Sequence, residues 1–193
     1  MIDMTGTRVG CAMTGSFCTF KGVFEAWEAL AATGAELTPI LSFNAAATDT
    51  RFGLAEQTRE RLREITGREP LRTLAQVEPI GPKKLLDALV IAPCTGNTLA
   101  KLAAGIADTP VTLAAKSHLR NGRPVVIAVS SNDALGQNAQ NLGRLLTTRN
   151  MFFVPFRQDD PQGKPNSLVA RFEKLPETLA MALEGRQIQP LIG

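Results

Sequence analysis

Short apolar runs alternate along the chain with longer amphipathic stretches, which is the pattern of parallel βαβ units. The first two strands are expected over residues 8–13 and 36–41. Two nearly continuous apolar runs, 87–92 and 125–129, are typical of strands covered on both faces, and we expect the first of them at the centre. A further strand is expected over 151–156. The pattern therefore predicts an α/β fold with a three-layer, doubly wound parallel sheet of Rossmann-like type.

Apolar residues at helical spacing predict the helices that connect these strands. Small polar residues mark several of their beginnings, and glycine follows several of their ends. Two helices are expected over residues 21–32, before Gly34, and 54–65, before Gly67. A third is capped by Asn97, and a fourth runs from Thr109-Pro110 to Asn121-Gly122. The last two are a helix that carries Leu135, Leu142, Leu145 and Leu146, and one from Pro176 to about Gly185.

Three segments lack this periodicity. Residues 44–53 are expected to form a polar loop, and within 68–84 only a short strand near Leu71 is expected. Residues 157–167 combine prolines, a glycine and charges, which predicts a long surface loop. Pro39 cannot donate to a strand ladder, so we expect the second strand to be offset or bordered by an irregularity.

Composition narrows the class of protein. With 193 residues, of which 44% are hydrophobic, the chain fits one compact domain over residues 1–193 that can form a core without disulfide or metal staples. The 21 basic and 18 acidic residues leave a net charge of only +3. Basic side chains are scattered and not interleaved with aromatic ones, so nucleic acid is not an expected partner.

The cysteines and the single histidine are not arranged as metal ligands. Cys11, Cys18 and Cys94 form no C-x-x-C pair, and we expect them to be small buried groups in a reducing compartment. His118 lies near a predicted helix end, where an imidazole can satisfy terminal carbonyls. Neither a signal segment nor a run of eighteen apolar residues is found, so we expect a cytoplasmic protein without a membrane span.

Three loops that follow predicted strands share small residues with hydroxyl or amide groups. They are residues 14–16, 95–98 and 130–133, and each leads into a helix N-terminus, where free N–H groups suit an anion. Ligands of open parallel sheets bind at the carboxyl ends of the strands, so we expect the loops to form one anion-binding crevice. Ordinary helix capping would also explain each loop alone. Neither G-x-G-x-x-G nor a P-loop is present, which argues against NAD and ATP.

The same residues carry a resemblance to a known family. Thr14-Gly15-Ser16, the stretch 92–98 and Ser131-Asn132 look like the three motifs of the flavoprotein superfamily that includes flavin-containing cysteine decarboxylases and flavin prenyltransferases. Nearly end to end, the chain also resembles the family of dipicolinate synthase B subunits. The stretches that carry this closer match are 14–19, 50–53, 119–122, 131–136 and 164–171.

The superfamily resemblance implies FMN at the strand ends, often between the subunits of a trimer or of a larger assembly of trimers. By this resemblance, Asn132 is expected to lie beside the flavin ring or the substrate. Asn132 and Arg51 are the expected catalytic residues. The residues expected to contact FMN are Thr14, Gly15, Ser16, Ser42, Thr95, Gly96, Asn97, Thr98, Ser130 and Ser131.

The B-subunit resemblance implies a partner and a reaction. Such subunits act with an A subunit, similar to a nicotinamide-dependent Rossmann protein, to form dipicolinate from dihydrodipicolinate or its hydrated precursor in the mother cell of a sporulating bacterium. The product is a small planar dianion, which fixed cations would bind. Arg51, Lys164, Asn166 and Arg171 are the expected substrate-binding residues, and solvated surface charges are the alternative reading of the three cations.

Two departures from the superfamily pattern bear on the reaction. The cysteine decarboxylases use a histidine near the second helix region, whereas His118 lies in a different segment. Their Pro-x-Met-Asn motif is Val129-Ser130-Ser131-Asn132 here, so only the asparagine is retained. We therefore expect an oxidoreductase subunit. The alternatives are a non-catalytic partner that stabilises the A subunit, and an FMN-dependent decarboxylase or prenyltransferase.

Overall fold

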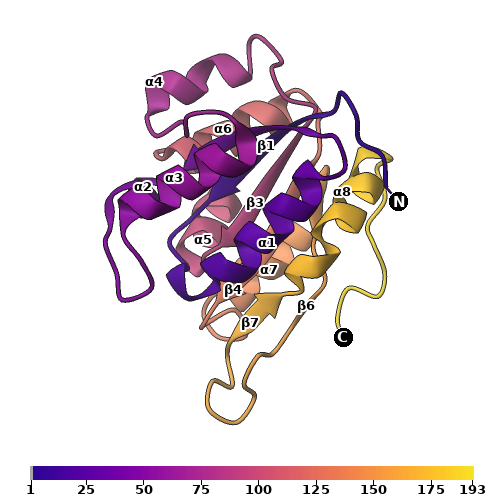
Figure 1. Cartoon of the computed structure of the whole chain (residues 1–193). Coiled ribbons are helices and arrows are strands. Elements are labelled where there is room, and N and C mark those ends of the chain that lie inside the picture. The colour runs from indigo at the N-terminus through magenta and orange to yellow at the C-terminus, as the bar shows by residue number, and fades with distance from the viewer. Residues whose placement is uncertain (1) are drawn as a thin grey trace.

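The computed structural model describes residues 2–193, and within them a seven-stranded sheet lies between two layers of helices (Figure 1). The strand order is β2-β1-β3-β4-β7-β6, and β5 also pairs with β4. The first five strands pair in parallel, whereas β7 is antiparallel to β4 and to β6. The strands are β1 (Arg8–Met13), β2 (Glu36–Leu41), β3 (Ala88–Cys94), β4 (Val125–Ser131), β5 (Met151–Phe153), β6 (Phe156–Arg157) and β7 (Leu168–Ala170).

Helices cover both faces of the sheet, as the expected doubly wound fold requires. The helices are α1 (Phe20–Ala31), α2 (Phe43–Ala47), α3 (Ala55–Thr66), α4 (Leu74–Val77), α5 (Gly96–Ala104), α6 (Pro110–Arg120), α7 (Ala139–Leu146) and α8 (Leu175–Leu183). Short 3-10 turns are η1 (Phe17–Thr19), η2 (Glu78–Ile80) and η3 (Phe172–Lys174). None of the helices in residues 2–193 combines the length and the apolar character needed to cross a bilayer.

Alternate strand residues divide the core into two layers. In β3, Val90 packs into the cluster that holds α1, α3 and α8, whereas Leu89 and Ile91 pack into the cluster that holds α5, α6 and α7. Trp27 of α1 is fully buried in the first cluster. This alternation follows from the period of two along a strand. The central position of β3 between β1 and β4 confirms the prediction made from its apolar run.

The antiparallel extension was not predicted, and Pro155 explains where it starts. The expected strand over 151–156 is interrupted: β5 ends at Phe153, and Phe156 pairs with Ala170 of β7 instead. Because Pro155 has no N–H, the ladder cannot continue through it. The loop between β6 and β7 covers most of the predicted segment 157–167 and projects from the body of the molecule (Figure 1).

Pro39 does not interrupt β2, so the expected offset is wrong. The Leu71 N–H donates to the Pro39 carbonyl at 2.9 Å, and Leu71 forms a parallel bridge with Ile40. The N and O atoms of one strand residue point to the same side, so the missing N–H of Pro39 faces the outer edge of the sheet, away from β1. The short strand expected near Leu71 is this single bridge.

Two helices begin at residues where no helix start was predicted, because their N-terminal caps are Ser42 and Thr95. The Ser42 hydroxyl accepts from the Ala45 N–H at 3.3 Å, so α2 forms within the segment expected to be a loop. The residue that caps α5 is Thr95, not Asn97, because the Thr95 hydroxyl accepts from the Thr98 N–H at 3.2 Å. Residue Leu135 lies in a turn and not in a helix, since α7 begins only at Ala139.

Candidate functional site

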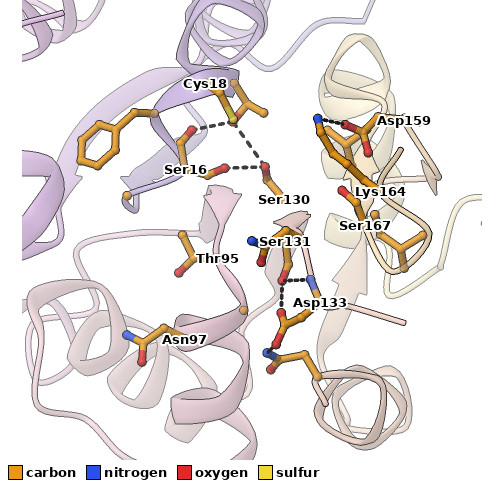
Figure 2. A pocket seen from close by; sticks show the side chains of 18 of the residues that line it. Ser16, Cys18, Thr95, Asn97, Ser130, Ser131, Asp133, Asp159, Lys164 and Ser167 are labelled. Atoms are coloured by element: carbon orange, nitrogen blue, oxygen red, sulfur yellow. Dashed lines mark hydrogen bonds and ion pairs between the residues drawn. The ribbon is translucent and has the colours of Figure 1, made fainter. Parts of the chain in front are cut away.

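The loops after β1, β3 and β4 meet at one end of the sheet, as predicted from their positions after parallel strands (Figure 2). The Ser16 and Ser130 hydroxyl oxygens lie 2.7 Å apart. The Thr95 N–H donates to the Thr14 hydroxyl at 3.0 Å, and that hydroxyl donates to the Pro93 carbonyl at 2.7 Å. These contacts join segments that are about 80 and more than 100 residues apart in sequence.

Two adjoining hollows are formed there. The larger, of about 570 Å³, lies between these loops and the β6–β7 loop, and we call it the crevice. The smaller, of about 380 Å³, is lined by Ser42, Thr98 and Lys101 among others, and we call it the polar hollow. Gly15, Thr95 and Asn97 line both, so the two hollows adjoin at the start of α5.

The beginning of α5 offers backbone donors to an anion. The Thr95 hydroxyl accepts from the Thr98 N–H, while the N–H groups of Gly96 and Asn97 have no hydrogen-bond acceptor within residues 2–193. Unsatisfied N–H groups at a helix N-terminus, together with the helix dipole, favour a negatively charged group. Lys101, one turn further on, adds a cation that is paired with Asp108 at 2.8 Å.

The turn after β4 forms the wall of the crevice next to α5, and a carboxylate that the sequence did not single out holds this wall together. The Asp133 carboxylate accepts from the Ser131 hydroxyl at 2.6 Å and from the Asn138 side-chain amide at 2.7 Å. Gly96 packs against this network: a β-carbon on Gly96 would lie 2.6 Å from the Ser131 hydroxyl and 2.7 Å from both an Asn138 amide nitrogen and an Asp133 oxygen. Only glycine permits this approach of α5 to the turn after β4.

The β6–β7 loop closes the side of the crevice away from α5, where Figure 2 shows Asp159, Lys164 and Ser167 grouped together. The Lys164 ammonium lies 3.3 Å from the Asp159 carboxylate. Partial burial raises the pKa of Asp159, but hydrogen bonds from Ser167 and Lys164 outweigh it, and the pKa is lowered overall. Asp159 therefore stays ionised at neutral pH and holds Lys164 at the crevice wall.

Most of the predicted site residues are brought together at the two hollows. Asn97 and Asn132 are exposed, and both line the crevice. The predicted residues that line the crevice are Gly15, Ser16, Thr95, Gly96, Asn97, Ser130, Ser131, Asn132 and Lys164. Those that line the polar hollow are Thr14, Gly15, Ser42, Thr95, Asn97 and Thr98.

Three predicted residues do not line either hollow within one chain. The Arg51 guanidinium carbon lies 4.8 Å from the centre of the Phe52 ring, and it is Phe52 that reaches the crevice. The Asn166 carbonyl accepts from the Leu135 N–H at 3.0 Å. Arg171 donates to Glu173 at 3.0 Å beside a separate hollow along α1.

Several lining residues were not predicted to contact a ligand. Asp133 and Ser167 lie in stretches that the family resemblance did mark, but Asn138 and Asp159 carry no motif that would reveal them. The phenylalanines that line the crevice were not predicted either, because phenylalanine in a helix or loop is more often a core residue. These unpredicted lining residues include Phe17, Cys18, Phe52, Asp133, Asn138, Asp159 and Ser167.

The cysteines and the histidine divide by burial. Cys11 and Cys94 are fully buried as expected, and burial raises the pKa of both thiols. The expectation was wrong for Cys18, which is exposed at the crevice because η1 leaves the core there. His118 is buried outside the crevice, next to Arg123 and the backbone of Asp87. Within residues 2–193, no three metal-binding side chains of His, Cys, Asp or Glu are grouped.

Comparison with known proteins shows likeness over the whole chain. The model of the Flavoprotein family matches residues 2–174. The B subunit of dipicolinate synthase from Bacillus subtilis (strain 168) is 47% identical over 192 residues, which cover 100% of this chain and 96% of that protein. The crystal structure of the dipicolinate synthase B subunit from Bacillus halodurans C has a TM-score of 0.92 and 46% identity, covering 100% of this chain and 98% of that one.

A more distant structure shares the fold alone. The crystal structure of Burkholderia xenovorans DmrB in complex with FMN has a TM-score of 0.67 and 22% identity, and the match covers 92% of this chain and 96% of that one. The α/β fold expected from the hydrophobic pattern is therefore confirmed by known structures.

Proposed function

The chain belongs to the Flavoprotein family and, within it, to the family of dipicolinate synthase B subunits, and on this premise we propose that its crevice and polar hollow hold FMN for the oxidation that forms dipicolinate. The observation that carries this proposal is the junction of the two hollows at the start of α5. The polar hollow suits an anion, and the crevice has room for a planar ring. FMN combines these two chemistries in one molecule.

The residues present fit a phosphate at one end. The polar hollow offers the hydroxyls of Ser42 and Thr98, the free N–H group of Asn97 and the Lys101 ammonium. The free N–H group of Gly96 lies next to it, at the start of α5. Hydroxyls, backbone N–H groups and a cation are the usual donors to a phosphate. On the crevice side the Asp133 carboxylate lies beside Gly96 and would repel a second negative charge. We therefore place the phosphate in the polar hollow and the flavin ring in the crevice.

The crevice residues would orient the ring and the substrate. Ser16, Ser130 and Asn132 line the crevice with hydroxyl and carboxamide groups. Lys164, paired with Asp159, lies on the wall away from α5. When bound, FMN supplies a reversible acceptor for two electrons. Dihydrodipicolinate must lose two electrons and two protons to become aromatic. The protein's part is to hold the substrate carboxylates and to exclude water around the reacting rings.

Two partners belong to this proposal. The Bacillus relatives are B subunits by name, which implies a second kind of subunit, and we propose that this chain acts with a nicotinamide-dependent A subunit. We also propose a homo-oligomer, a trimer or a multiple of trimers, in which Arg171, which lies outside the crevice of its own chain, would contact a neighbouring copy. The DmrB neighbour from Burkholderia xenovorans is a cubic protein cage.

Flavin binding is the first expected result. Purified protein titrated with FMN should quench the flavin fluorescence at a defined stoichiometry. Replacing Asn97 by alanine should weaken FMN binding by roughly 1–3 kcal/mol, which is about fivefold to 150-fold, because a hydrogen bond to the ligand is lost. Gln140→Ala, which removes an exposed carboxamide from α7, is the matched control and should bind FMN like the parent protein. Absence of flavin binding by the parent protein would disprove the cofactor assignment.

A non-catalytic role is the second candidate function. The observation that favours it is the position of His118, which is buried outside the crevice and therefore gives the crevice no imidazole. The same position argues against a decarboxylase mechanism that uses this histidine. Dipicolinate formation by the A subunit should be measured with and without this chain. Full turnover by the A subunit alone would favour a stabilising partner over an oxidoreductase subunit.

A further inference from the structure

An aromatic groove of about 500 Å³ lies beside the crevice. Its wall contains Phe17, Phe20, Phe24 and Phe52, and the rings of Phe17 and Phe20 have centres 5.2 Å apart. Phe52 and its neighbour Leu54 are 53% and 50% exposed. Large apolar side chains gathered at one exposed place indicate a binding surface.

The groove continues into the crevice. Phe17, Cys18 and Phe52 line both hollows. A planar molecule seated against Phe52 in the groove would therefore lie next to whatever ring the crevice holds. The hollow beside Ile106 and Lys116, by contrast, shares no lining residue with the crevice.

The charged residues that line the groove are all positive. The lining residues include Lys21 and Arg61 and contain no aspartate or glutamate. The Arg51 guanidinium lies over the Phe52 ring, so a third cation lies at the rim. Arg61 already pairs with Glu28 and Glu64, which leaves Lys21 and Arg51 for an anion.

Lys21 occupies a position that a helix disfavours. It is the second residue of α1, and the first turn of that helix contains no acidic residue. A cation beside the positive end of the helix dipole lowers stability unless an anion joins it. Within residues 2–193, Lys21 forms no ion pair. A negatively charged group from outside the chain would therefore stabilise this end of α1.

We propose that the aromatic groove binds a planar aromatic carboxylate, with its ring against Phe17 and Phe52 and a carboxylate between Lys21 and Arg51. Ring stacking on phenylalanine and charge-assisted hydrogen bonds supply the two parts of this recognition. The inference rests on the proposed function for the choice of a pyridine dicarboxylate as the ligand. The other possible occupant is a second copy of this chain, which the test below distinguishes from a small carboxylate.

The test is a calorimetric titration of flavin-free protein with dipicolinate. Lys21→Gln and Phe52→Ala should each weaken dipicolinate binding by about tenfold, since one removes a carboxylate partner and the other a stacking ring. Lys116→Gln on α6 and Ile106→Ala are the matched controls, since both residues are exposed outside the groove lining, and they should bind like the parent protein. Cyclohexane dicarboxylate, which is not planar, should bind more weakly than dipicolinate.

Three results would overturn the assignment. Unchanged dipicolinate affinity in Lys21→Gln and Phe52→Ala, together with its loss in Lys164→Gln, would place the acid in the crevice alone. No binding to the parent protein would remove the ligand altogether. A change of assembly size in Phe52→Ala with unchanged dipicolinate binding would identify a second copy as the occupant.

The proposed function is judged separately by FMN titration of the same samples. Parent protein that binds dipicolinate through Lys21 but does not bind FMN would support the groove and refute the flavin site. If the parent protein binds FMN, and dipicolinate binding does not depend on Lys21 and Phe52, the flavin site is supported and the groove is refuted. The two failures are thus distinguishable.

Discussion

Gly96→Ala is expected to lower the free energy of unfolding by about 3 kcal/mol, since two hydrogen bonds to the Asp133 carboxylate would have to break or stretch. The new β-carbon would lie within 2.7 Å of atoms of Ser131, Asp133 and Asn138. These atoms are tied to one another, so none of them can move away without a loss elsewhere. The wall of the crevice would shift with them, and FMN affinity should fall by at least about tenfold.

Urea denaturation and FMN titration of the same protein measure the two effects of Gly96→Ala. Gly143→Ala is the matched control, because Gly143 is exposed in α7 and a β-carbon there would meet no atom within 4 Å. That substitution should stabilise the protein by about 0.5–1 kcal/mol through helix propensity alone. Equal stability of the two variants would show that the Asp133 network is not a rigid wall.

Acidification is expected to destabilise the protein through His118. Burial and, after it, the nearby Arg123 lower the pKa of His118 to about 4, and together they outweigh the contacts with Asp87 and Pro124 that raise it. The Nε2 atom has no hydrogen-bond partner within residues 2–193, so protonation would create a buried charge without a new acceptor. Asp87 is already engaged by Arg8 and Arg123.

The direction of this pH effect follows from the number of protons that the folded and the unfolded states bind. Because the pKa is about 4 in the folded protein against 6.5 in the unfolded chain, the unfolded chain binds the proton first as the pH falls. Stability from this group is therefore complete above pH 6.5 and is lost between pH 6.5 and 4. The loss should reach roughly 3 kcal/mol at the lower end of that window.

Urea denaturation across this pH range tests the prediction on the parent protein and on His118→Phe. The aromatic substitution keeps most of the buried volume and removes the titration, so its stability should be flat where that of the parent protein falls. His118→Gln serves as a second non-titrating variant if phenylalanine does not pack. Parallel pH profiles for the parent protein and both variants would show that another group governs acid stability.

The elements that the sequence predicted well are those whose pattern is local. Residues 8–13 and 36–41 form strands with the expected bounds, because a period of two and β-branched or apolar residues mark them directly. The continuous apolar character of β3 and β4 also predicted their burial on both faces. The carboxyl ends of parallel strands lie at one edge, so the meeting of their three loops could be predicted as well.

The site was only partly predictable, because some of its contacts join distant parts of the chain. Hydroxyl-rich loops indicate a ligand-binding edge, and the loops after β1, β3 and β4 do line the crevice. Arg51, Asn166 and Arg171 were expected from the family resemblance at the same place, and they lie elsewhere in the single chain. Side-chain direction in a loop depends on its tertiary packing, which the spacing of residues does not encode.

The amino-acid sequence by itself determined the alternation of strands and helices, the buried centre of the sheet and the edge where polar loops gather, since each depends on periodicity within a short window. Only the tertiary structure decided that Gly96 faces Asp133, that Pro155 turns the chain into an antiparallel extension, and that Phe17 and Phe52 form a groove. Those features are contacts between distant segments, and their geometry exists only once the sheet has brought the segments together.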